Sequence, residues 1–265
     1  MKKFWFILTA LVATCFLVAC SGSQGVSPKT IKEKKKIVVA TESEFAPFEF
    51  KSLVNGKDTL VGADIELAKA IGEKLGVKVE FSVMSFDNVL ANVQSGKADI
   101  AIAGISVTDE RKKVYDFSDS YYTSENVVIV KKDKVNDYTS TDSLAKQTVG
   151  TQKGSVQETV AKKQIPKASV VSLASNGEMI NELKSGQLQA VVLKKAIAEG
   201  YIAQNDDLTL ANFNLKSDGT DAYAVATRKG SDDLLKEINA VIKETKDSGK
   251  FDQWLKEAST YKQSK

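Results

Sequence analysis

The spacing of hydrophobic positions changes repeatedly along the chain, and these changes predict alternating strands and helices. Apolar residues recur at helical intervals over Ala63–Leu75, and Gly76 follows as a helix stop. Residues 77–83 alternate between apolar and polar, as in a strand with one buried face. Residues 37–40 and 100–103 are short apolar runs, typical of strands covered on both faces. The chain is therefore predicted to be α/β, with mostly parallel sheets.

A weak internal repeat indicates two lobes of similar build. Residues 95–104 and 185–194 each have the pattern of a helix end, a glycine turn and a buried strand. This register makes Gly104 and Lys194 equivalent positions at the carboxyl ends of two strands. In open α/β sheets that end of the strand faces the ligand crevice, so both residues are candidates for a binding site.

Two apolar segments are placed to cross between the lobes, which predicts two hinge strands. Residues 126–130 would lead from the first lobe to the second, and residues 221–227 would lead back. An amphipathic helix over 231–249 and a short helix around 251–255 would then complete the first lobe. We expect the first lobe to comprise residues 37–127 and 222–257, and the second lobe to comprise residues 128–221.

The first nineteen residues have the pattern of an export signal. Two lysines precede an apolar run over 4–18, which is too short to span a bilayer comfortably. The run ends in Leu-Val-Ala-Cys, which resembles a bacterial lipobox and makes Cys20 the expected lipidation site. An ordinary secretory signal is the alternative. The polar residues 20–36 are expected to form a flexible tether, which would hold the protein to the outer face of the cell membrane.

The composition excludes several classes of function. The chain contains no histidine, so it has neither a Ser-His-Asp triad nor a histidine-ligated metal site. Its 37 basic and 34 acidic residues give a net charge of +3, which is too small to indicate nucleic-acid binding. Removal of the export signal would also remove Cys15, and Cys20 would carry lipid, so no disulfide is expected. We expect neither a metal nor a cofactor.

Four motifs occur in order along the chain. They are Glu-x-x-Phe-Ala-Pro-Phe-Glu-Phe over 42–50, the helix start over 62–71, Gly-Ile-Ser-Val-Thr-Asp-Glu-Arg over 104–111, and Asp-Phe-Ser-Asp-Ser-Tyr-Tyr over 116–122. Together they resemble the polar amino acid-binding proteins of ABC importers, over about residues 36–255. The resemblance implies a two-lobe periplasmic-binding-protein type II fold with two hinge strands. It also implies a small amino acid ligand, and a permease with its ATPase as partners of a monomer.

The resemblance assigns Arg111 to the ligand carboxylate. A guanidinium group is permanently charged and offers two parallel donors, which matches a carboxylate. Ser106 and the backbone around Gly104 and Thr108 would add further donors. Two alternatives remain open: Arg111 could be a solvated helix residue, and Thr108 could be only a helix N-cap.

The same resemblance places Phe45 and Phe86 on either side of the ligand side chain. Aromatic faces accept cations and flat polar groups, although both residues could instead belong to the core. Glu42 would meet a cationic or amide group of the ligand, with a surface position as the alternative. Glu44 points to the same strand face and could assist.

In the second lobe, residues 150–157 resemble the family's glycine-rich turn into a helix. Backbone N–H groups at such a helix start attract carboxylates, so Ser155 and the amide of Val156 are expected to close over the ligand, with Gln152 nearby. The Lys-Ser ending of a phosphate-binding loop is absent from this turn.

Lys194 departs from the family pattern, because the resemblance implies an acidic residue that holds the ligand ammonium at this position. Glu178 or Asp221 could replace it, or the ligand could be something other than a free α-amino acid. For Lys194 itself we expect the ammonium either to turn into solvent or to contact an anionic group, and we favour the first.

The motifs predict capture of a polar amino acid, with a basic one, arginine, first. Glutamine or a small amino-acid-derived solute is the alternative ligand. A dehydratase-like enzyme on the same fold, or a sensor or adhesion protein, is the alternative class.

Overall fold

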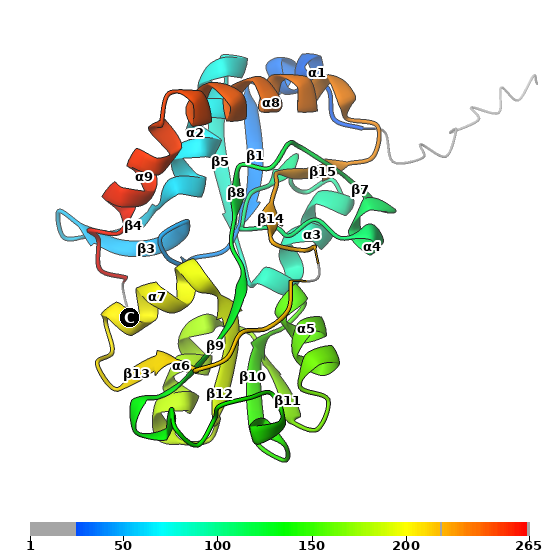
Figure 1. Ribbon diagram of the computed structural model, residues 1–265. Coiled ribbons are helices and arrows are strands. Elements are labelled where there is room, and N and C mark those ends of the chain that lie inside the picture. The colour runs from blue at the N-terminus through cyan, green and yellow to red at the C-terminus, as the bar shows by residue number, and fades with distance from the viewer. Residues whose placement is uncertain (1–24, 218, 264–265) are drawn as a thin grey trace, which may run out of the picture.

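The computed structural model describes residues 25–217 and 219–263, which form two stacked lobes (Figure 1). The first lobe is built on a five-stranded sheet with the order β5-β1-β6-β15-β7. Strand β1 runs parallel to both of its neighbours, β5 and β6, whereas β15 is antiparallel to β6 and β7. The strand bounds are β1 (Lys36–Thr41), β5 (Lys78–Val83), β6 (Ile100–Ala101), β7 (Tyr115–Phe117) and β15 (Ala226–Arg228).

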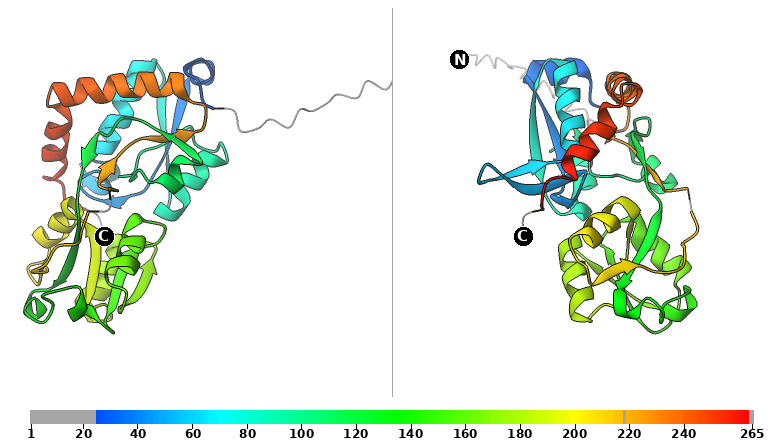
Figure 2. Two further views of the ribbon diagram at one scale, coloured as in Figure 1. Left: turned by 45° about the vertical axis from the view of Figure 1, so that its right-hand side comes forward. Right: turned by 60° about the vertical axis from the view of Figure 1, so that its left-hand side comes forward.

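Helices from both ends of the described chain cover this sheet. In both views of Figure 2, the late helices α8 and α9 lie on the same lobe as the early helix α2, and α2 contacts both. Helix α2 has the predicted bounds, and Gly76 ends it in the left-handed conformation, with φ of 70°. The helices are α1 (Pro28–Lys34), α2 (Ala63–Leu75), α3 (Phe86–Gln94), α4 (Asp109–Lys112), α8 (Asp232–Asp247) and α9 (Lys250–Ala258).

A small three-stranded sheet projects from the first lobe and carries part of the 42–50 motif. Its strands β2 (Glu44–Phe45), β3 (Glu49–Val54) and β4 (Lys57–Val61) are antiparallel neighbours. Asn55 and Gly56 form the turn between β3 and β4, with φ of 52° and 76°. Positive φ at both central positions matches the twist of a tight hairpin. This sheet positions Phe45 near the strand ends of the main sheet.

The second lobe repeats the same plan. Its five-stranded sheet has the order β11-β10-β12-β9-β13, and β10 runs parallel to β11 and β12. Strands β6 and β12 are the central strands of their sheets. Each follows a glycine with positive φ, Gly96 at 77° and Gly186 at 84°, so the predicted repeat is confirmed. The elements are β9 (Asn126–Lys131), β10 (Thr148–Gln152), β11 (Ser169–Leu173), β12 (Ala190–Lys194), β13 (Leu208–Leu210), α5 (Val156–Gln164), α6 (Asn176–Ser185), α7 (Lys195–Ala203) and the short 3₁₀ turns η1 (Lys132–Lys134) and η2 (Asp142–Leu144).

Two strands connect the lobes, although one lies earlier in the chain than expected. Strand β8 (Tyr122–Thr123) pairs antiparallel with β14 (Ala222–Tyr223), and both lie where the chain passes between the lobes (Figure 1). The segment 126–130, predicted to cross, is instead part of β9 inside the second sheet, paired with β12. Its apolar run is continuous because β9 is buried on both faces.

The expected flexible tether is partly wrong. Residues 28–34 form helix α1, which Ser27 caps by accepting a hydrogen bond from the Thr30 amide. Ile31 is fully buried, and the Val26 amide donates to Ser231 Oγ at 2.8 Å. A single well-placed isoleucine thus packs this lysine-rich segment onto the first lobe. The predicted export signal and Cys20 lie outside the described residues.

Candidate ligand-binding site

Most of the predicted site residues meet in one cavity between the lobes. The cavity is small, and the roughly 240 Å³ in and around it that protein atoms do not fill includes space open to solvent. Glu42 and Ser155 do not line it, but Glu42 is hydrogen-bonded to Gln152 and Ser155 precedes Val156 in the chain. The lining residues are Phe45, Phe86, Gly104, Ser106 and Arg111 from the first lobe, and Gln152, Val156, Gln157 and Lys194 from the second.

Arg111 extends from the short helix α4 toward the second lobe. Its guanidinium donates to the Ser106 carbonyl at 2.7 Å and to the Gly154 carbonyl across the cleft at 3.1 Å. The guanidinium carbon lies 5.8 Å from the centroid of the Phe86 ring. Burial lowers the pKa of Arg111 to about 10, so the group stays charged at neutral pH. Arg111 is therefore a fixed cation on the cavity wall.

Thr108 acts as a helix cap here, because its Oγ1 accepts a hydrogen bond from the Arg111 amide at 3.1 Å. This contact fixes the start of α4 and the direction of the arginine. Of the two roles considered for Thr108, the structure places it as the N-cap of α4.

At Gly104 the absence of a side chain matters more for the cavity than the backbone N–H group does. Its N–H donates to Asp64 Oδ2 at 3.1 Å, so the expected backbone donor at this position is already engaged. A Cβ built at Gly104 would lie 2.4 Å from Phe45 Cε1, and its φ is 53°. Only glycine lets the Phe45 ring approach the strand end this closely. Asp64 also accepts from the Tyr121 hydroxyl at 2.8 Å, and burial raises its pKa to about 6.

Phe45 and Phe86 are both buried and both line the cavity, with 7% and 9% of their surfaces exposed. Phe45 packs against Phe48 and Tyr223, with ring centroids 5.7 and 6.1 Å apart. The two roles considered for these aromatics therefore coincide, because each ring has one side in the core and contributes to the cavity wall.

Glu42 is a buried carboxyl group that contacts the second lobe. Its Oε2 accepts a hydrogen bond from Gln152 Nε2 at 2.9 Å, and 3% of the residue is exposed. Burial, helped to a smaller extent by the charge of Glu44, raises its pKa to about 8, although the hydrogen bond from Gln152 acts in the opposite direction. A carboxyl group with so high a pKa is mostly protonated at neutral pH until a cation neutralises it.

Three buried polar atoms around this cavity have no hydrogen-bond partner among the described residues. They are Glu42 Oε1, Ser155 Oγ and Asn126 Nδ2. Buried polar atoms in native proteins are nearly always paired, because leaving one unpaired costs about 1–3 kcal/mol. Their grouping indicates a site built for a polar ligand.

The second lobe meets the cavity through the turn between β10 and α5. Ser155 is the N-cap residue of α5, and Val156 is its first residue. Gln157, which sequence reasoning did not select, also lines the cavity and donates through Nε2 to Asn126 Oδ1 at 2.7 Å. Its place in the 150–157 motif, one residue beyond Val156, was the available signal.

Lys194 does not turn into solvent, so the orientation favoured from the sequence is wrong. Only 2% of the residue is exposed. Its ammonium donates to the Thr220 carbonyl at 3.1 Å and pairs with Asp221 Oδ1 at 3.3 Å. Asp221 therefore lies behind Lys194, whereas Glu178 is exposed on helix α6 and is not on the cavity wall. Because Lys194 is the last residue of the buried strand β12, its side chain does not extend into solvent.

Glu44 closes the cleft instead of lining it. Its Oε2 accepts a hydrogen bond from the Gly177 amide at 3.0 Å, in the first turn of α6 in the other lobe. The Glu44 carbonyl accepts from Asn176 Nδ2 and from the Tyr201 hydroxyl. On the opposite lobe edges, Lys153 pairs with Asp87 at 2.9 Å. These contacts hold the lobes together around the cavity.

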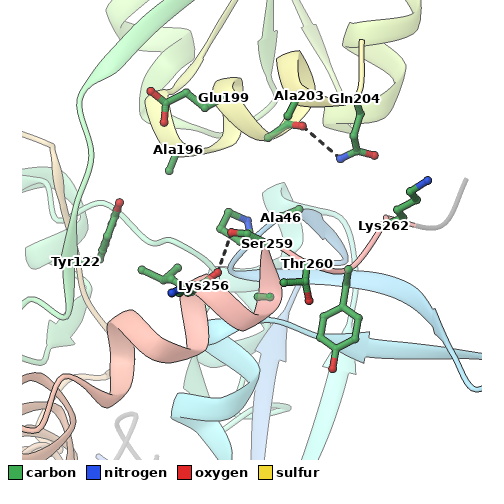
Figure 3. Close-up of a pocket in the computed structure, with 15 residues that line it drawn as sticks. Ala46, Tyr122, Ala196, Glu199, Ala203, Gln204, Lys256, Ser259, Thr260 and Lys262 are labelled. Atoms are coloured by element: carbon green, nitrogen blue, oxygen red, sulfur yellow. Dashed lines mark hydrogen bonds between the residues drawn. The ribbon is translucent and has the colours of Figure 1, made fainter. Parts of the chain in front are cut away.

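A wider cavity lies elsewhere, between helices α7 and α9. Figure 3 shows Ala196, Glu199 and Gln204 on one side of it, with Lys256 and Ser259 on the other. It encloses about 1240 Å³ of unfilled space, but none of the predicted ligand residues lines it. A surface hollow lined by Arg111, Ser155 and Val156 is larger still, so size does not identify the ligand site. The charged groups and the unpaired buried polar atoms favour the cavity at Arg111.

The sequence matches the family model described as bacterial extracellular solute-binding proteins, family 3, over residues 37–258. The chain belongs to this family. The predicted resemblance and the two-lobe α/β fold are therefore confirmed.

Named relatives of this family 3 member bind amino acids. The arginine-binding extracellular protein ArtP of Bacillus subtilis is 34% identical, over 97% of each chain. The glutamine-binding protein GlnH of the same organism, from an ABC transporter, is 32% identical over 97% of this chain and 98% of its own. The crystal structure of the amino acid ABC transporter substrate-binding protein AbpA of Streptococcus pneumoniae, bound to L-arginine, is 50% identical with a TM-score of 0.85, covering 87% of this chain and 97% of that chain.

Within residues 25–217 and 219–263, none of the helices is long and apolar enough to cross a bilayer. The same part of the chain holds no cluster of three or more acidic, cysteine or histidine residues that could ligate a metal.

Proposed function

We propose that this protein captures L-arginine outside the cytoplasm and delivers it to an ABC importer. The observation that carries the proposal is the charge pattern at one cavity: a fixed guanidinium, Arg111, lines it, and a buried carboxyl group, Glu42, adjoins it through Gln152. Arginine carries the complementary groups, a carboxylate at one end and a cation at the other. The names of ArtP and arginine-bound AbpA support the same ligand.

Each wall of the cavity has a separate task in this proposal. Arg111 and the polar groups near Ser106 hold the ligand carboxylate, and the turn at Ser155 and Val156 closes over it from the second lobe. Phe45 and Phe86 pack along the ligand side chain. Glu42 loses its proton to become the partner of the ligand guanidinium, and Gln152 keeps its carboxylate in position.

Binding is tested first by thermal unfolding in the presence of each of the twenty amino acids, ornithine and citrulline. A ligand at 100 times its dissociation constant adds about 2.7 kcal/mol to the free energy of unfolding. Arginine should give the largest shift. A larger shift with glutamine, with none for arginine, would identify the amide as the ligand.

A second measurement separates binding from catalysis on the same fold. The protein is incubated with a stoichiometric amount of arginine, and the released ligand is analysed by mass spectrometry. Unchanged arginine recovered in a one-to-one ratio is expected. Accumulation of a product with time would instead support the dehydratase-like alternative.

Lipid anchoring through Cys20 belongs to the same proposal, because an importer's receptor must stay near its permease. The Cys20→Ser variant should leave the membrane fraction or accumulate as an uncleaved precursor. Cys15→Ser is the matched control, since Cys15 lies inside the predicted export signal, and it should remain anchored. Membrane association of the Cys20→Ser variant equal to that of the control would exclude this anchor.

A further inference from the structure

We propose that Lys194 determines which groups of the ligand the site recognises. The site selects for the carboxylate and the distal cation, and it does not select for the α-amino group. The protein would then also bind guanidino carboxylates whose α-amino group is missing. This inference rests on the proposed function and names the class of ligand for the same site.

The first observation is the sign of the charges on the cavity wall. Two of the lining residues, Arg111 and Lys194, are cations, and none of the lining residues is acidic. Glu42 reaches the cavity only through Gln152. A ligand carboxylate therefore meets two positive groups, one from each lobe, whereas a ligand ammonium meets no carboxylate on the wall.

The second observation is that Lys194 is fixed in place. Its ammonium is held by the Thr220 carbonyl and by Asp221, and it lies 5.9 Å from the centroid of the Tyr223 ring. Asp221 is itself held, since its Oδ2 accepts a hydrogen bond from Ser217 Oγ at 2.6 Å. Lys194 cannot leave the wall when a ligand enters, because Thr220 and Asp221 belong to the segment leading into β14.

The Lys194–Asp221 pair carries no net charge. Its interaction with the α-ammonium of a ligand is therefore weak. Lys194 is the nearer partner and repels the ammonium, while Asp221 behind it attracts the ammonium and offsets part of that repulsion. The α-ammonium is therefore tolerated but contributes little selectivity.

The test compares three ligands by isothermal titration calorimetry with the full protein. They are L-arginine, 5-guanidinopentanoic acid, which lacks the α-amino group, and agmatine, which lacks the carboxylate. We expect the dissociation constants of the first two to agree within about tenfold, and agmatine to bind more than about a hundredfold more weakly.

Two substitutions should change this ratio. Lys194→Asp supplies a carboxylate, and Lys194→Met removes the lysine charge and leaves Asp221 to attract the ammonium. Each should raise the preference for arginine over 5-guanidinopentanoic acid by about tenfold or more. Because Lys194→Met conserves side-chain length, it keeps the test available if Lys194→Asp does not fold. Lys195→Asp is the matched control, since Lys195 is partly exposed and paired with Glu125, and it should leave the ratio unchanged.

The outcomes separate the two proposals. If wild-type protein binds arginine at least about a hundredfold more tightly than 5-guanidinopentanoic acid, this inference is wrong while arginine binding stands. If none of the three ligands binds, the proposed function itself is wrong. If the Lys194 variants keep the wild-type ratio, Lys194 does not read the ligand.

Discussion

The two lobes share a sheet plan but present different chemistry where their equivalent strands end. After β6 the chain reaches Gly104, whose missing side chain admits the Phe45 ring. Strand β12 ends at Lys194, which has a long, charged side chain at the position that the repeat makes equivalent. A repeated backbone frame thus fixes where a site forms, while single residues at strand ends decide what each lobe contributes to it.

The charged groups that would read the ligand's two ends are also unevenly distributed. The first lobe supplies Arg111 and Glu42, whereas the second supplies the neutral amide Gln152, the turn at Ser155, and Lys194 already neutralised by Asp221. This difference indicates that the first lobe provides most of the binding free energy and that the second lobe mainly closes over the ligand. The predictions below test this division.

The largest effect is expected from Arg111→Ala. Removing the guanidinium leaves the ligand carboxylate buried without its main partner, which should cost at least about 3 kcal/mol of binding free energy, or more than a hundredfold in affinity. Ser155→Ala in the second lobe should weaken arginine binding by less than about tenfold, because it removes a single neutral donor. Calorimetry on both variants, with exposed Lys112→Ala as control, measures the difference. Equal losses from the two lobes would contradict the proposed division.

The next effect concerns pH and Glu42. In the folded, ligand-free protein, burial raises the pKa of Glu42 from its ordinary value of 4.5 to about 8. A raised carboxyl pKa means that the stabilising contribution is fully present below the unfolded value and is lost as pH rises through the folded value. The free energy of unfolding should therefore fall by up to about 1.4 kcal/mol per pH unit between these values.

Arginine affinity should move in the opposite direction, because the ligand cation needs an ionised Glu42. Between pH 6.5 and 8 we expect affinity to rise by up to about tenfold per pH unit and then level off. Asp64, with a pKa of about 6, titrates mostly below this window. Glu42→Gln should bind arginine weakly and show no such rise. A wild-type profile that is flat from pH 6.5 to 8 would mean that Glu42 is not the group that meets the ligand cation.

Parts of this structure followed from local sequence signals, and the exceptions have physical causes. Helical spacing and Gly76 were enough to define α2, since the apolar face of the helix and the glycine that ends it are both local features of the sequence. The Asn55-Gly56 pair was an equally local hairpin signal for β3 and β4 that the sequence reading did not use. The packing of α1 depends on one residue, Ile31, in a polar segment whose composition indicates a tether.

The site was predictable to the extent that it lies in contiguous motifs. Arg111, Ser106 and Gly104 come from one such motif and line the cavity together. The sequence offered Asp221 only as a possible partner of the ligand ammonium, and its pairing with Lys194 was not predicted, because Asp221 is 27 residues away along the chain and is brought in by the hinge segment. Protonation of Glu42 likewise depends on burial produced by both lobes, which no local pattern contains.

A third effect is expected to distinguish Gly104, which is packed against a side chain, from Gly186, which is surrounded by open space. Gly104→Ala should force Phe45 aside, since the added Cβ would lie 2.4 Å from its ring. We expect arginine affinity to fall by about tenfold and stability to fall by about 1–3 kcal/mol, from overpacking and positive φ. Gly186→Ala also has positive φ, but nothing lies within 4 Å of its Cβ. It should lower stability by about 1 kcal/mol and leave binding unchanged, as thermal unfolding and calorimetry would report.

The smallest effect is expected from Glu44, a first-lobe residue that contacts the second lobe without lining the cavity. Its carboxylate accepts the Gly177 N–H at the start of α6, where the helix dipole favours negative charge. Glu44→Gln keeps an acceptor but removes the charge, which should cost about 0.3–1 kcal/mol of closure, or two- to fivefold in affinity. Because the contact forms only when the lobes meet, stopped-flow kinetics should show this loss as faster arginine release with an unchanged association rate. Exposed Glu178→Gln, which is one residue beyond Gly177, provides the matched control and should release arginine at the wild-type rate. A slower association rate in the Glu44 variant, with release unaltered, would place Glu44 in first contact with the ligand and remove it from the closing of the second lobe.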